Sequence, residues 1–179
     1  EKYDSMEKYD KNIITMLAFN QSVSADKVSE INRAIASNPK LLGFANSEMI
    51  RMLRSPGNYL ADYRHENLYE LAASSGSIAL YAILNNERKE SAFKTYNFFN
   101  NEMDKYERDC FINAFHKNNI RLIKYMLRSD RLSQTTRKTI FTCMRHISDK
   151  KNPMLFDFMA ESVDINKIYT VSIPSDFTN

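Results

Sequence analysis

The chain has 179 residues, enough for one domain with a substantial buried core or for a short array of repeats. Its 3 glycines and 4 prolines leave turn signals sparse, and no alternating pattern indicates a β-hairpin, so long helices are favoured over a sheet. No apolar run approaches the length of a membrane span, and the net charge of +3 is small.

The 2 cysteines are too few for a disulfide framework, and no signal peptide is visible. Both observations are typical of a reducing compartment, so we expect a cytoplasmic protein. Because the sequence opens on Glu1 rather than Met, we also expect it to be a piece of a longer protein.

Residues 1–60 are predicted to form a helical N-terminal extension. An apolar pattern at helical spacing ends at Pro39, and Ser47 can cap a short second helix. Pro56 and Gly57 then stop that helix, and the following residues are expected to form a loop to about residue 66.

Residues 61–169 contain a pattern that repeats. The segment "LYELAASSGSIALYAIL" (68–84) consists of two short apolar stretches separated by Ser-Ser-Gly, and "FINAFHKNNIRLIKYML" (111–127) has the same plan 42 residues later. This offset aligns Gly76 with Asn118, two residue types that tolerate a left-handed turn conformation. A third copy, "CMRHISDKKNPMLFDFM" (143–159), follows the second at an offset of 33. Each copy is predicted to be a pair of antiparallel helices. An irregular tail is predicted over residues 170–179, after the last copy.

The repeat resembles the ankyrin family, whose unit is about 33 residues with two helices and a turn. Leu71-Ala72-Ala73 and then Gly76 stand where that family has its first helix and its interhelical glycine, and Asp164 and Asn166 are similar to its repeat ending. The family's Thr-Pro-Leu-His helix opening is absent from all three copies. The region between the first two copies holds nine extra residues, and Ser91–Phe99 within it is predicted to be an additional helix. Another helical-hairpin solenoid is the second interpretation.

The resemblance implies an all-α, single-domain solenoid of two-helix ankyrin-like repeats that recognises a protein partner without catalysis. Degenerate ankyrin stacks of this kind resemble the accessory domains of effectors that intracellular bacteria deliver into host cells, and also some proteins of large viruses. That likeness implies a location in the host cytoplasm.

Positive charge is concentrated in one stretch, residues 117–151, which holds ten basic and two acidic residues and so carries +8 while the remainder carries −5. Arg121, Lys124 and Arg128 recur at helical spacing, with Leu122, Ile123, Tyr125 and Met126 on the packing side. The full candidate binding set is Arg121, Lys124, Arg128, Arg131, Arg137 and Lys138. An acidic protein surface and an anionic membrane or phosphoinositide headgroup both fit this set, as does an ordinary solvated face. Nucleic acid is disfavoured because no recognised motif or interleaved aromatic residues accompany the charge.

Catalytic and metal chemistry find little support in the sequence. Cys110, His116, Cys143 and His146 are the only Cys-and-His set that the repeats could bring together, but Cys110 and His116 lie on different helix faces. Both cysteines occupy equivalent repeat positions that the core is expected to bury. We therefore predict no catalytic residue, no metal site and no cofactor. A catalytic fragment remains the third hypothesis, and it requires an exposed, reactive cysteine.

Overall fold

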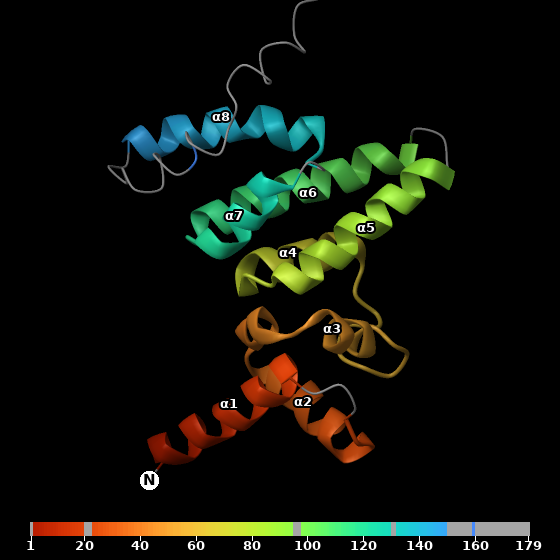
Figure 1. Cartoon of the computed structure of the whole chain (residues 1–179), viewed down its shortest axis with the longest axis vertical. Helices are drawn as coiled ribbons and strands as arrows, with labels where there is room; N and C mark the ends of the chain where they lie inside the picture. Colours follow the sequence, from red (N-terminus) through yellow and green to blue (C-terminus); the bar gives the residue numbers. More distant parts are fainter. Residues whose placement is uncertain (1, 20–22, 95–97, 130–131, 150–158, 160–179) are drawn as a thin grey trace, which may run out of the picture.

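The computed structural model describes residues 2–19, 23–94, 98–129, 132–149 and 159, and every regular element in these ranges is a helix (Figure 1). The predicted all-α class is therefore confirmed. In chain order the elements are α1 (Lys2–Phe19), α2 (Ala25–Ser37), the 3-10 helix η1 (Pro39–Phe44), α3 (Ser47–Leu53), α4 (His65–Ser75), α5 (Ile78–Lys94), α6 (Phe98–His116), α7 (Ile120–Arg128) and α8 (Gln134–Asp149).

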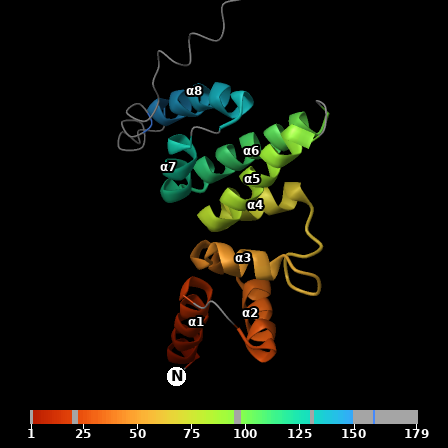
Figure 2. The ribbon, with the colours of Figure 1, turned by 45° about the vertical axis from the view of Figure 1, so that its right-hand side comes forward.

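The helices follow one another along the long axis of the molecule, from α1 and α2 at one end to α8 at the other (Figures 1 and 2). One layer contains α1, η1, α4, α6 and α8, in which each element contacts the next. A second layer contains α3, α5 and α7, and α5 contacts both of the others. Because α4 also contacts α5, and α6 contacts α7, the layers are joined pair by pair.

One apolar core runs through the successive pairs, from Ile13 in α1 to Met159. Tyr69, Tyr81 and Phe111 are its largest fully buried side chains. Isolated helices shorter than about 12–15 residues are marginal in water. The short helices α4 and α7 therefore depend on the apolar surface that their neighbours cover.

The two turns inside the pairs α4–α5 and α6–α7 have the same construction. Gly76 and Asn118 both adopt a left-handed conformation, with φ of 70° and 58°. After each of them, the next backbone N–H donates to an alanine carbonyl five residues earlier, Ser77 to Ala72 at 3.0 Å and Asn119 to Ala114 at 2.9 Å. This is the hydrogen bond of a Schellman helix end. The alignment of Gly76 with Asn118 predicted a left-handed residue at both positions, and this prediction is confirmed.

Two asparagines join successive pairs in the same way. Asn46 precedes α3, and its side-chain N–H donates to the Ala18 carbonyl near the end of α1 at 3.1 Å. Asn119 precedes α7, and its side-chain N–H donates to the Ala73 carbonyl near the end of α4. Each asparagine therefore satisfies a carbonyl that the helix end leaves without an intrahelical partner.

An ion-paired cluster links α3, α4 and α5. Glu87 of α5 accepts hydrogen bonds from Arg54, which follows α3, and from His65 at the start of α4, the latter at 3.3 Å. Partial burial alone would raise the pKa of Glu87, but the bonds from His65 and Arg54 outweigh burial and lower it.

Two local predictions are wrong. Ser91–Phe99 is not a separate helix, since α5 continues to Lys94 and α6 begins at Phe98. No Gly or Pro interrupts residues 78–94, so nothing ends α5 earlier. Ser47 does not cap α3 either, because Asn46 occupies that position and its side chain accepts from the Met49 N–H at 2.8 Å.

Most of the third predicted copy (143–159) lies outside the described residues. Only residues 143–149 and 159 of it are described. Cys143 and Met159 are both buried there, as Cys110 is at the equivalent position of the second copy. The predicted irregular tail, 170–179, also lies outside the described residues.

Candidate functional site

A groove of about 600 Å³ lies where η1 meets the turns of the two helix pairs α4–α5 and α6–α7. Its walls come from η1, from the end of α4 and its turn, and from the α6–α7 turn with the start of α7. The charged residues that line it, among those the structure describes, are all basic: Lys40, Lys117 and Arg121. The groove is therefore a preformed surface of positive potential.

Two apolar side chains lie at the same groove. Phe44 is 48% exposed and Ile120 is 39% exposed, which places both among the most exposed large apolar residues of the described chain. An aromatic ring and an aliphatic side chain beside three cations can contact a ligand that has both apolar and acidic groups.

Two of the residues that line the groove are glycines, and each lets neighbouring elements lie close together. A Cβ atom at Gly43 would overlap the carbonyl oxygen of Ser75, so η1 can approach the end of α4 only because this residue has no side chain. Gly76 needs its left-handed φ, and a Cβ atom there would lie 3.3 Å from the side-chain oxygen of Asn119. Both glycines therefore serve the close approach of neighbouring pairs.

The first turn of α7 opens onto the groove with free backbone donors. Asn119 makes no side-chain cap to α7, since its amide group is turned toward the Ala73 carbonyl. Among the described residues, the N–H groups of Arg121 and Leu122 have no hydrogen-bond acceptor. Such donors, at the positive end of a helix dipole, favour a negatively charged group nearby.

The structure separates the six predicted basic residues. Arg121 lines the groove, whereas Arg128 is exposed at the far end of α7 and Lys124 is half-buried between them. Arg137 is half-buried on α8, where it donates to the Leu132 carbonyl at 3.3 Å, and Lys138 is exposed on the same helix. Arg131 lies outside the described residues.

The prediction missed Lys40, Phe44 and Gly43, which lie about 80 residues before Arg121, Lys124 and Arg128 in the sequence. Only the order of stacking brings η1 beside the α6–α7 turn, so no local pattern could have identified them. Tyr125 also differs from expectation. It is 40% exposed, and its ring meets the buried Tyr81 edge-on at 6.1 Å instead of packing fully inside.

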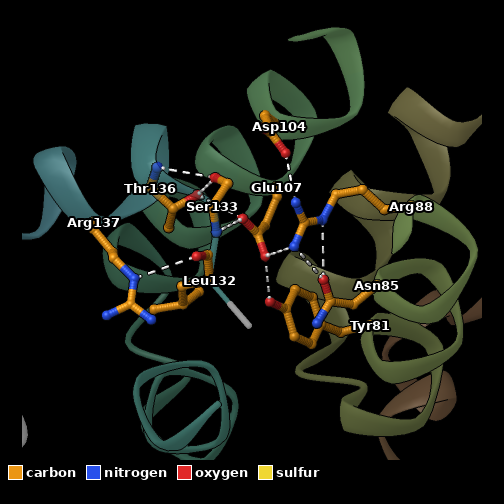
Figure 3. A network of polar contacts seen from close by, with 9 residues as sticks. All are labelled: Tyr81, Asn85, Arg88, Asp104, Glu107, Leu132, Ser133, Thr136 and Arg137. Atoms are coloured by element: carbon orange, nitrogen blue, oxygen red, sulfur yellow. Dashed lines mark hydrogen bonds and ion pairs between the residues drawn. The ribbon is translucent and has the colours of Figure 1, made fainter. Parts of the chain in front are cut away.

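A second cluster of polar groups surrounds Glu107 of α6, whose side chain is 0% exposed (Figure 3). One carboxylate oxygen accepts from the Tyr81 hydroxyl at 2.8 Å. The other accepts from the Ser133 N–H at 2.8 Å and from the Thr136 hydroxyl at 2.9 Å. The guanidinium of Arg88 lies 3.7 Å away and also donates to Asp104 at 2.6 Å.

This cluster has the properties of a structural tie. Buried charges are tolerated when they are paired and fully hydrogen-bonded, and the Glu107 carboxylate meets this condition. Its acceptor oxygens fix the first turn of α8, where the Ser133 side chain also accepts from the Thr136 N–H at 3.1 Å. Because Glu107 is closed to solvent, its carboxylate offers no surface to a substrate.

Both cysteines are buried and have raised pKa values. Burial raises the pKa of Cys143 to about 11, and burial together with the Glu107 charge raises that of Cys110. A nucleophilic cysteine needs the opposite, an exposed thiol with a lowered pKa. Within the described ranges, no three Cys, His, Asp or Glu side chains are grouped so that they could hold a metal ion.

No helix in the described part of the chain is long and apolar enough to cross a membrane. Comparison of the chain with known protein families, curated proteins and solved structures finds no match. The case for a function therefore rests on the groove and on the way the helix pairs are stacked.

Proposed function

We propose that the chain is a protein-recognition domain without catalytic activity, built as a solenoid of ankyrin-like helix pairs. Two observations support this architecture. The turns at Gly76 and Asn118 have the same backbone conformation and the same hydrogen bond. The asparagines Asn46 and Asn119 link successive pairs in the same way, which extends the proposed solenoid into the N-terminal segment.

The mechanism is preorganisation. In a stack of repeats, each unit is held by its neighbours, and the binding surface exists before the partner arrives. Association then costs little conformational entropy, since few backbone segments must become ordered. Gly43 and Gly76 contribute by allowing the close approach of the elements that line the groove.

The groove with Lys40, Lys117 and Arg121 is the observation that carries the proposal. It draws residues from η1 and from the turns of the pairs α4–α5 and α6–α7, and its described charged residues have one sign. A surface of this kind selects partners by electrostatic complementarity and accelerates their encounter. Its exposed Phe44 and Ile120 add apolar contact area to such an interface.

An anionic membrane surface is the second candidate. Arg121, Arg128 and the half-exposed Tyr125 lie on α7 and could meet a lipid headgroup layer. A recessed groove is a poorer match to a flat bilayer than to a polypeptide, so we favour a protein partner.

The proposal is tested by capturing proteins on the immobilised chain and then measuring whether a purified captured protein binds the chain. A captured protein is purified and titrated into the chain by calorimetry at about 50 and 300 mM salt. We expect saturable 1:1 binding, an affinity that falls moderately with salt, and an unchanged far-UV circular dichroism spectrum. Binding to phosphatidylserine vesicles, with no captured protein that binds when purified, would overturn the proposal.

A further inference from the structure

We infer that the groove takes an extended acidic segment of the partner, about six residues long, in which a carboxylate side chain stands beside an apolar one. This inference rests on the proposed function and specifies the chemistry of the partner. It is carried by the charge, the dimensions and the apolar rim of the groove.

The charge favours carboxylates. Lys40, Lys117 and Arg121 come from three different elements, yet all three line one groove, and no described acidic residue neutralises them there. Cations gathered on a concave surface repel one another, and an anionic ligand relieves this repulsion. The free N–H groups of Arg121 and Leu122 lie in the same wall and add to the positive potential.

The dimensions favour an extended chain. Packed helices lie about 8–10 Å apart, so a groove that runs from η1 across the end of α4 to the α6–α7 turn is about 20 Å long. An extended polypeptide rises about 3.3 Å per residue and covers this length with about six residues. Because the groove is recessed, with Gly43 and Gly76 among its lining residues, it fits a polypeptide better than a flat bilayer surface.

The rim favours apolar neighbours of the carboxylate. Phe44 lies on η1 and Ile120 at the start of α7, so the two apolar side chains stand in different walls of the groove. In an extended segment, successive side chains point in opposite directions, and alternate residues can therefore meet the cations and the apolar rim.

Selection of peptides on the intact chain tests the inference. Random octapeptides displayed on phage are selected on the immobilised chain, and the strongest binders are resynthesised with a fluorescent label. Their affinity is measured by fluorescence anisotropy for the wild type and for Lys117→Glu/Arg121→Glu. The matched control is Lys27→Glu/Lys105→Glu, which changes the net charge equally at exposed helix positions outside the groove.

We expect selected peptides to contain Asp or Glu next to an apolar residue. Their affinity should fall by about tenfold or more in Lys117→Glu/Arg121→Glu and by less than about twofold in the control. Replacing the peptide carboxylate by lysine should restore binding to the groove variant, a result that a merely misfolded variant could not give.

Three results would overturn the inference: no peptide selected, selected peptides without carboxylates, or equal affinity for the groove variant and the control. Charge-dependent binding to phosphatidylserine vesicles in place of peptides would also overturn it. If a purified protein partner binds the groove variant as tightly as the wild type, the inference fails and the proposed function stands. If no protein or peptide binds the wild type, both fail.

Discussion

Two buried tyrosines allow a matched pair of Tyr→Phe substitutions. Tyr69 and Tyr81 are both fully buried, and their rings meet edge-on at 6.3 Å. The Tyr81 hydroxyl donates to Glu107 at 2.8 Å, whereas the Tyr69 hydroxyl has no hydrogen-bond partner among the described residues. Replacing each by Phe removes one oxygen atom and leaves the ring, so the two variants differ mainly in the hydrogen bond that is lost.

The structure gives a different magnitude for each variant. A hydrogen bond to a charged group contributes about 1.5–3 kcal/mol, so Tyr81→Phe should lower the free energy of unfolding by about that amount. An unsatisfied buried hydroxyl costs stability, so Tyr69→Phe should leave the free energy of unfolding unchanged or raise it by up to about 1 kcal/mol.

Urea unfolding followed by circular dichroism at 222 nm measures both variants against the wild type. A loss of about 2 kcal/mol corresponds to a midpoint lower by about 1 M urea when the slope is about 2 kcal/mol per M. Equal losses in the two variants, or a larger loss in Tyr69→Phe, would refute the assignment of Glu107 as the buried hydrogen-bond acceptor that joins α5, α6 and α8.

Three further predictions concern other parts of the fold. Gly43→Ala should lower the unfolding midpoint, because the added methyl group overlaps the Ser75 carbonyl; an unchanged midpoint would contradict this close approach. Glu87 has a lowered pKa in the folded chain, so its ion pairs stabilise the protein above its ordinary pKa of 4.5, and this stability is lost as the pH falls through the lower folded value. Glu87→Gln should therefore be less stable than the wild type at about pH 7, and the difference should shrink as the pH is lowered toward about 3, as urea unfolding at both pH values would measure. Cys110 and Cys143 should react with a thiol reagent only slowly at about pH 8 and rapidly in denaturant, since both are buried and their pKa values are raised; rapid labelling of the native chain would reopen the catalytic hypothesis.

The parts of the fold that depend on local sequence patterns could be predicted. The left-handed turns at Gly76 and Asn118 were predictable because few residue types tolerate that conformation, and their alignment fixed both positions. Leu122 was predicted to lie on the packing side of its helix, and it is fully buried. The split of Ser91–Phe99 between α5 and α6 was not predictable, since no residue there marks a helix end.

The candidate site was only partly predictable for a physical reason. Arg121 was identified by its helical spacing with Lys124 and Arg128, a relation within one helix. Lys40 and Phe44 belong to the site because η1 stacks beside α4, which is a relation between distant segments. Glu107 was missed as well, because a single acidic residue in a charged helix gives no sign that its neighbours in space will be Tyr81 and the first turn of α8.

Hydrogen exchange of the bound complex tests most directly the claim that the groove is the recognition site. The chain is exchanged with and without a saturating selected peptide, and protection is read by mass spectrometry of proteolytic fragments. We predict that protection will be gained mainly over residues 39–44 and 117–122, including the free N–H groups of Arg121 and Leu122. Protection gained on α2 or α8 with none in these two segments would contradict recognition at the groove.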